Sequence, residues 1–104
     1  MQKLAANRWF MLGESRREAG QEGVTEAYEE AARAAPSSQT TNYNVALMLL
    51  RMNELEKSAA YALKAIALDP VRPGPYLLAE QVLERLGRKE ALQDLHKRAR
   101  EWAP

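Results

Sequence analysis

Three prolines recur at a fixed interval along the chain. Pro36, Pro70 and Pro104 stand 34 residues apart, and an alanine precedes each by five positions, at Ala31, Ala65 and Ala99. Each proline follows an apolar stretch that would end there if it were helical, because proline has no N–H to donate and its ring clashes with the preceding turn. Such a recurrence predicts an array of similar units, each of which buries its apolar face only against its neighbours.

Between the prolines, the apolar side chains follow a helical period. They recur at three- and four-residue spacings among polar positions, as from Val45 to Leu49 and from Leu83 to Leu86. Gly20, Asn53 and Gly87 interrupt each unit near its middle, and both residue types tolerate the left-handed conformation that ends a helix. The pattern therefore predicts an all-α chain with six helices, at about residues 3–19, 22–35, 39–52, 55–68, 74–86 and 88–102. Pro73 and Pro75 suit the start of the fifth helix.

Length and charge limit what these helices can form and bind. A chain of 104 residues is sufficient for a single domain over 1–104. Fifteen Lys and Arg residues against fourteen Asp and Glu give a net charge of +1, which predicts no nucleic-acid partner. The longest apolar stretch is far shorter than the ~20 residues of a membrane span, which predicts no direct membrane insertion. The absence of cysteine rules out disulfides, thiol catalysis and cysteine-bound zinc.

The repeated unit resembles the tetratricopeptide repeat (TPR), a 34-residue helix-turn-helix unit with a Trp-x-x-Leu-Gly opening, a later small residue and a closing proline. The first unit matches it at Trp9, Leu12, Gly13, Gly20, Tyr28, Ala31 and Pro36, and the second at Tyr43, Val45, Ala46, Leu49, Leu55, Ala62, Ala65, Leu68 and Pro70. The third matches at Tyr76, Ala79, Leu83, Leu86, Gly87, Ala91, Ala99 and Pro104, although Glu80 occupies a small-residue position. Asn42 stands where the opening aromatic residue is usual.

The resemblance implies a right-handed helical-repeat solenoid of about six antiparallel helices, with repeats at about 5–36, 39–70 and 73–104. Gly13, Ala46, Ser58 and Ala65 would let the two helices of a pair approach closely. A chain that ends in phase with its last repeat also fits a piece of a longer protein.

The chain offers little for catalysis. His96 has Asp94 two residues away, which points elsewhere on a helix, so a solvated terminal-helix histidine is favoured over a metal or acid-base role. Acid-base pairs need burial and shifted pKa values, whereas the carboxylate pairs Glu29 with Glu30 and Glu14 with Glu18 lie among arginines on polar helix faces. We therefore expect no enzyme, with no catalytic residue, no cofactor and no metal.

Binding is the function that the resemblance implies. In TPR arrays the first helices of successive repeats line a concave groove, and the matched positions form an unusually apolar surface for a protein or peptide partner. These candidate groove residues are Phe10, Met11, Glu14, Tyr43, Asn44, Leu47, Arg51, Leu77, Leu78, Gln81 and Arg85. A shifted register would instead turn some of them inward, as plain core.

A known use of the family gives a sharper test. The clamp that TPR domains use for the acidic C-termini of chaperones needs lysine, arginine and asparagine at five positions, and only Asn44 matches. Phe10, Glu14, Gly74 and Leu78 occupy the other four. We therefore expect an interaction module or scaffold that binds apolar rather than acidic segments.

A structural role remains open beside peptide binding. The glutamates crowd the first repeat and the basic residues crowd the last, which allows head-to-tail self-association as well as ordinary solvation. The alternative function is thus a self-association or docking domain of a larger protein, with a homo-oligomer as one outcome.

Overall fold

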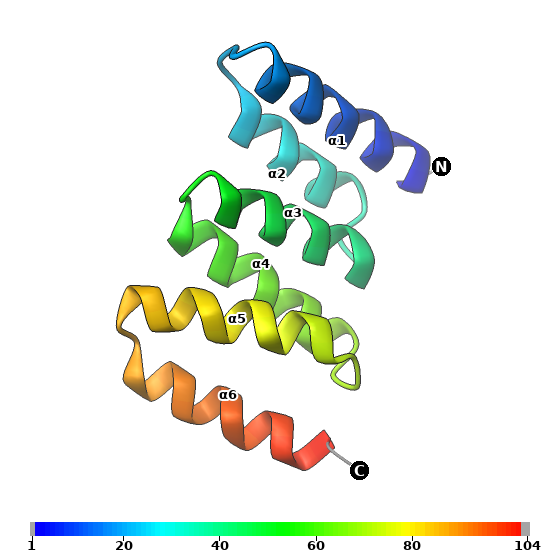
Figure 1. Cartoon of the computed structure of the whole chain (residues 1–104). Helices are drawn as coiled ribbons and strands as arrows, with labels where there is room; N and C mark the ends of the chain where they lie inside the picture. The colour runs from blue at the N-terminus through cyan, green and yellow to red at the C-terminus, as the bar shows by residue number, and fades with distance from the viewer. Residues whose placement is uncertain (1, 103–104) are drawn as a thin grey trace.

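A computed structural model describes residues 2–102 of the chain; Met1, Ala103 and Pro104 lie outside the described residues, so the role of Pro104 in closing the third repeat is not addressed. Six α-helices make up the described part: α1 (Gln2–Glu18), α2 (Val24–Ala34), α3 (Gln39–Arg51), α4 (Leu55–Leu68), α5 (Pro73–Leu86) and α6 (Lys89–Trp102). They form antiparallel pairs that stack in chain order from one end of the molecule to the other (Figure 1). The predicted all-α array is confirmed, and every helix end lies within two residues of its prediction.

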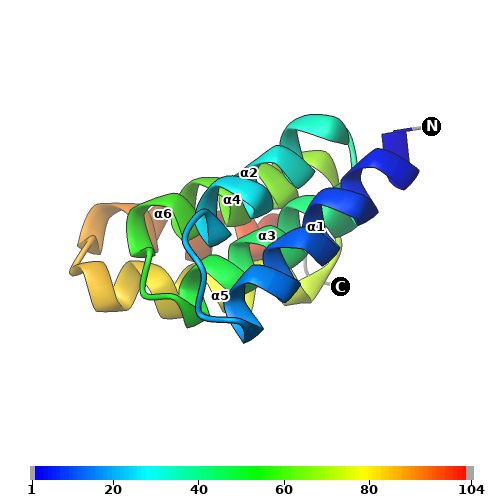
Figure 2. The ribbon, with the colours of Figure 1, turned by 90° about the horizontal axis from the view of Figure 1, so that it is seen from above.

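The six helices form two layers. Viewed along the stack, α1, α3 and α5 lie on one side and α2, α4 and α6 on the other (Figure 2). We call the side formed by α1, α3 and α5 the first-helix face and the opposite side the second-helix face. Each helix contacts its successor in the chain, and α5 also contacts α3. The fold therefore presents two long, separate surfaces.

The turns are formed by the residues that interrupt the helical pattern. Gly20, Asn53 and Gly87 have φ values of 66°, 61° and 68°, so all three adopt the left-handed conformation expected of them. Gly23 is also left-handed, at φ 83°, which delays the start of α2 from the predicted residue 22 to Val24. The helix starts also follow their sequence signals, because the Ser38 side chain caps α3 and Pro73 is the first residue of α5.

Small residues bring the two helices of the first pair into contact. Gly13 is buried, and a Cβ atom there would lie 2.8 Å from the ring of Tyr28 on α2. In the second pair, the Ser58 hydroxyl donates a hydrogen bond of 2.7 Å to the Ala46 carbonyl oxygen. Ala65 is also fully buried. The close approach is therefore confirmed at Gly13, Ala46 and Ser58, whereas Ala65 is shown only to be buried.

Two clusters of buried side chains form the core. One lies between the first pair and α3 and contains Tyr28, Val45 and Leu49. The other joins α3 and α4 to the third pair and contains Ile66 and Val82. The half-buried ring of Tyr61 on α4 packs against both, so the core continues from one pair to the next.

The third pair replaces the close contact by a polar one. In each repeat, the same position of the first helix lies next to the same position of the second helix. These two positions hold Gly13 and Tyr28 in the first pair and Ala46 and Ala62 in the second. In the third pair these positions hold Glu80 on α5 and His96 on α6, whose Oε2 and Nε2 atoms lie 2.7 Å apart. His96 is exposed, as expected of a solvated histidine, and its contact with Glu80 is one that the sequence did not indicate.

Asn42 occupies the position of the expected aromatic residue and is fully buried. Its Nδ2 atom donates a hydrogen bond of 2.8 Å to the Ser38 carbonyl oxygen and a longer one, of 3.4 Å, to that of Pro36. Its Oδ1 atom has no hydrogen-bond partner among the described residues. Asn42 thus ties the start of α3 to the preceding turn, at the cost of one unpaired buried oxygen.

Gly13→Ala tests the contact between α1 and α2. Alanine favours a helix over glycine by about 1 kcal/mol, so a site without constraint would become more stable. Here we expect the free energy of unfolding to fall by ~1–3 kcal/mol, because the new methyl group must displace a buried aromatic ring. Urea denaturation followed by circular dichroism measures the change. Ser15→Ala, at an exposed position of the same helix, is the control, and a Gly13→Ala variant more stable than the native chain would contradict the contact.

Candidate functional site

The first-helix face carries most of the candidate groove residues at its surface. Six of them are exposed: Met11, Asn44, Arg51, Leu77, Gln81 and Arg85. Four are half-buried: Phe10, Glu14, Tyr43 and Leu47. Ten of the eleven residues are therefore at least partly exposed on α1, α3 and α5.

Leu78 differs from the other ten. Only 5% of its surface is exposed, and it packs with Ala46, Leu50 and Val82 in the core. Because α5 contacts both α3 and α4, this side of α5 faces its neighbours and not solvent. Leu78 is a core residue, and its assignment to the groove was wrong.

Phe10 is partly drawn into the core as well. Its ring centroid lies 5.1 Å from that of Tyr28, at an angle of 51°, and the ring packs against the first core cluster. Tilted aromatic pairs at this distance are favourable. The ring of Phe10 is thus partly exposed on the first-helix face, and its buried part packs α1 against α2.

A cleft opens on the first-helix face between the starts of α3 and α5, and we call it the central cleft. It has a volume of about 370 Å³ and is lined by Gln39, Thr40, Tyr43, Asn44, Arg72, Pro73, Gly74 and Pro75. A Cβ atom on Gly74 would lie 3.5 Å from the Tyr43 ring, so the start of α5 lies directly against that ring. Sequence analysis identified Tyr43 and Asn44 as groove residues and Gly74 as a clamp position, but it did not predict the cleft that they form. The run of Pro73, Gly74 and Pro75 was the available signal for a close approach.

Glu14 is held in place below the surface of the same face. Its Oε1 atom accepts a hydrogen bond of 2.5 Å from the Tyr28 hydroxyl, and its Oε2 atom lies 3.0 Å from Nη2 of Arg17. The hydrogen bond from Tyr28 is the largest cause that lowers the pKa of Glu14, and the charges of Arg17 and Arg51 lower it further. Burial, followed by the hydrogen bond to Glu14, raises the pKa of Tyr28 to about 12. Glu14 is therefore an ionised carboxylate held in place by Tyr28 and paired with Arg17.

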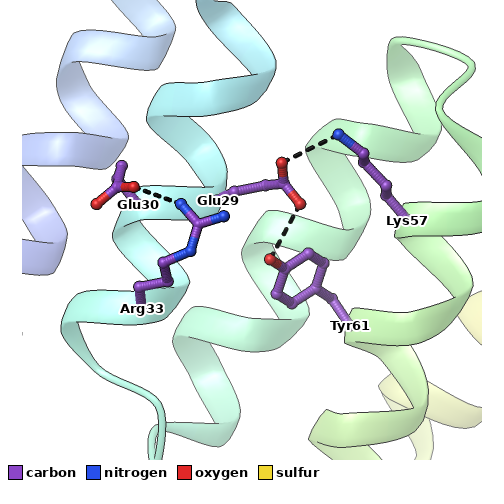
Figure 3. A network of polar contacts seen from close by, with 5 residues as sticks. All are labelled: Glu29, Glu30, Arg33, Lys57 and Tyr61. Atoms are coloured by element: carbon purple, nitrogen blue, oxygen red, sulfur yellow. Dashed lines mark hydrogen bonds and ion pairs between the residues drawn. The ribbon is translucent and has the colours of Figure 1, made fainter.

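The second-helix face has a polar network that links two repeats (Figure 3). Glu29 on α2 accepts two hydrogen bonds from α4. The Lys57 Nζ atom donates to its Oε2 atom at 3.1 Å, and the Tyr61 hydroxyl donates to its Oε1 atom at 3.2 Å. The hydrogen bond to Glu29 raises the pKa of Lys57, and burial raises that of Tyr61. Glu30 instead pairs with Arg33 on its own helix. These two carboxylates are held by separate partners, so their arrangement is one of structural contacts and not of an acid-base pair.

Two further properties concern all the described helices. Within residues 2–102, no group of three histidine, aspartate or glutamate side chains is placed to hold a metal ion. None of the helices in this range has both the length and the apolar character that crossing a bilayer requires.

Comparison with known proteins identifies the fold. No protein-family model matches the sequence, and no curated protein matches it. Among solved structures, the second TPR domain of Spaghetti (RPAP3), bound to the HSP90 peptide SRMEEVD, superposes with a TM-score of 0.69 at 18% identity, covering 98% of this chain and 90% of that chain. The first TPR domain of the same protein, bound to the same peptide, gives 0.68 at 17% identity, covering 98% of this chain and 84% of that chain. The chain has the tetratricopeptide-repeat fold.

Within the TPR fold, the five positions of the chaperone-tail clamp can now be compared with the structure. Phe10 packs on an aromatic ring, Glu14 is an engaged anion, and Leu78 is buried. Gly74 has no side chain and lies against Tyr43. Asn44 alone presents the polar group of that clamp to solvent. None of the five positions supplies a positive charge for a peptide carboxylate.

The raised pKa of Tyr28 predicts a loss of stability in alkali. Its pKa is about 12 in the folded chain against 10.0 for an ordinary tyrosine, so the proton is held more tightly when the chain is folded. The stabilisation is complete below about pH 10 and is lost as the pH rises towards about 12. Urea denaturation across this range should show a steep fall for the native chain and a shallower one for Tyr28→Phe.

Glu14→Gln is the matched control for this titration. It removes the carboxylate but leaves Tyr28 buried, and burial is the larger cause of the raised pKa. We therefore expect Glu14→Gln to keep most of the alkaline dependence. An unchanged dependence in Tyr28→Phe would show that other groups produce it.

Proposed function

We propose that this domain, residues 1–104 with repeats at about 5–36, 39–70 and 73–104, binds a peptide segment of a partner protein on its first-helix face. The observation that carries the proposal is the central cleft, where the ring of Tyr43 and the exposed amide of Asn44 lie beside the start of α5. An aromatic wall with a nearby amide suits a peptide, because the ring packs on a side chain while the amide can pair with the peptide backbone.

The chemistry of the face favours an apolar or neutral segment. The TPR domains of Spaghetti are bound to a peptide with two glutamates and a terminal aspartate. In this chain Arg17 is already paired with Glu14, and Arg72 with Asp69, so neither arginine is free to pair with the carboxylates of such a peptide. Exposed Met11 and Leu77 offer apolar contact area on either side of the cleft region. Apolar burial is therefore the proposed source of affinity.

A binding role also fits the ionisable side chains. Glu14, Tyr28 and Glu29 each make contacts that join one helix to another, which is a structural use of these groups. We propose a protein-interaction module and not an enzyme, with no nucleic-acid partner. The alternative role in self-association depends on other surfaces of the molecule.

Selection of peptides tests the proposal. Panning a phage-displayed library of random peptides against the domain should enrich sequences with aliphatic or aromatic side chains, and calorimetry should then measure their affinity. Asn44→Ala should weaken the enriched peptides about tenfold, which corresponds to about 1.4 kcal/mol. Synthetic SRMEEVD should bind at least ~100-fold more weakly than the best enriched peptide, since four charge-assisted contacts are missing.

A pair of arginine variants controls for location. Thr40→Arg places a long side chain in the central cleft and should abolish binding, whereas Ala60→Arg, at an exposed position of α4, should leave it unchanged. Equal loss in both variants, or no enrichment above the Thr40→Arg background, would contradict the proposed site. Tight binding of SRMEEVD that weakens with salt would contradict the proposed chemistry.

A further inference from the structure

A second cleft lies at the C-terminal end of the array, and we call it the C-terminal cleft. Its volume is about 550 Å³, and it is lined by Pro70, Val71, Pro73, Tyr76, Leu77, Ala99 and Trp102. The Tyr76 hydroxyl donates a hydrogen bond of 2.7 Å to the Pro70 carbonyl oxygen, so it is already paired, and the indole N–H of Trp102 is the other polar side-chain group in the lining. The cleft therefore suits an apolar occupant.

The large exposed apolar side chains gather at two places. Four lie on α1: Leu4, Trp9, Met11 and Leu12. The other four lie at the end of α4, in the following turn, on α5 and on α6: Leu68, Val71, Leu77 and Trp102. In the described part of the chain, α2 and α3 carry none. Contiguous exposed apolar side chains of this kind mark interaction surfaces.

The repeat itself shows what covers such a cleft. Tyr43, Ala65 and Leu68 in the second repeat are the counterparts of Leu77, Ala99 and Trp102. There, the first turn of the next helix lies on the site, with Gly74 against the Tyr43 ring and the following Pro75 buried. Ala65 is consequently fully buried, whereas Ala99 is half-exposed and Leu77 is 66% exposed. The fitting occupant is the beginning of another first helix.

Helix α1 has exposed apolar residues at positions whose counterparts on α3 are buried. Its residues Trp9 and Leu12 are each 38% exposed, whereas their counterparts Asn42 and Val45 on α3 are fully buried against the preceding pair. With Ala5 and Arg8 they form a shallow cleft of about 330 Å³ on the outer side of α1. Leu4 and Ala5 give α1 an apolar and exposed first turn. Within residues 2–102, no helix packs on this side of α1, whereas α3 and α5 each follow a preceding pair.

We propose that α1 of a second copy of this chain packs into the C-terminal cleft, in the way that α5 packs on the second repeat. The array would then continue from one copy to the next, with Leu4 and Trp9 of one copy covering Val71 and Trp102 of the other. The contact is heterologous, so each pair of copies still has one free cleft and one free α1. The assembly therefore grows beyond a dimer. Because the matched surfaces are apolar, we expect salt to weaken it little.

Solution mass tests the proposal with two double variants. Leu4→Glu/Trp9→Glu blocks α1, and Val71→Glu/Trp102→Glu blocks the C-terminal cleft; none of the four residues lines the central cleft. Light scattering on a dilution series from about 10 µM to about 1 mM should show the native mass rising above that of a dimer. Each double variant alone should stay monomeric. An equimolar mixture of the two should form a one-to-one dimer that does not grow, because the mixture retains one matched pair of surfaces.

The controls separate this proposal from folding and from peptide binding. Met11→Glu, at a side chain 67% exposed but outside the α1 cleft, should assemble like the native chain. Circular dichroism should show native helicity in every variant, and Leu4→Glu and Val71→Glu alone provide milder versions. Peptide affinity at the central cleft should be unchanged in both double variants. A native chain that remains monomeric, one that stops at a symmetric dimer, or a variant mixture that stays monomeric would each overturn the proposal.

Discussion

Contact between the two helices of a pair is the constraint on which the rest of this structure depends. Where Gly13 meets Tyr28, the helices come close enough for an aromatic ring to fill the space between them. That ring belongs to the core cluster that continues into α3, so the spacing of the first pair also determines how the second pair packs. A solenoid has no central core, and its order is transmitted through such nearest-neighbour contacts.

The same ring connects the core to the first-helix face. Tyr28 is fully buried, yet its hydroxyl reaches Glu14 and orients a carboxylate towards Arg17. The position of the Glu14 carboxylate on the face is therefore a product of core packing, which distinguishes it from a mobile surface glutamate. On the opposite face, Glu29 links α2 to α4 through Lys57 and Tyr61, so a carboxylate that sequence analysis rejected as part of an acid-base pair joins two repeats.

Sequence-based prediction succeeded where local chemistry decides the structure. Left-handed Gly20, Asn53 and Gly87, the proline at the start of α5 and the small residues between helices are all determined by steric limits that a sequence displays. It failed for Leu78, because the side of α5 that is buried depends on how closely α3 and α5 approach each other. It also failed for Glu80 and His96, which are 16 residues apart, because their pairing depends on the spacing of two packed helices. The clefts were missed for the same reason, since they arise where helices of different repeats meet.

The polar contact between Glu80 and His96 has a consequence for the dynamics of the array. In the first two pairs, buried rings and methyl groups join the helices. At the equivalent position of the third pair, two half-exposed side chains join them, and α6 buries only Leu95. In a one-dimensional array, the free energy that holds a terminal helix is the sum of its few local contacts, so that helix opens more often than the whole chain unfolds. Amide hydrogens of α6 would accordingly exchange with solvent through local fraying, whereas those of α3, enclosed on both sides, would exchange only when the entire domain opens.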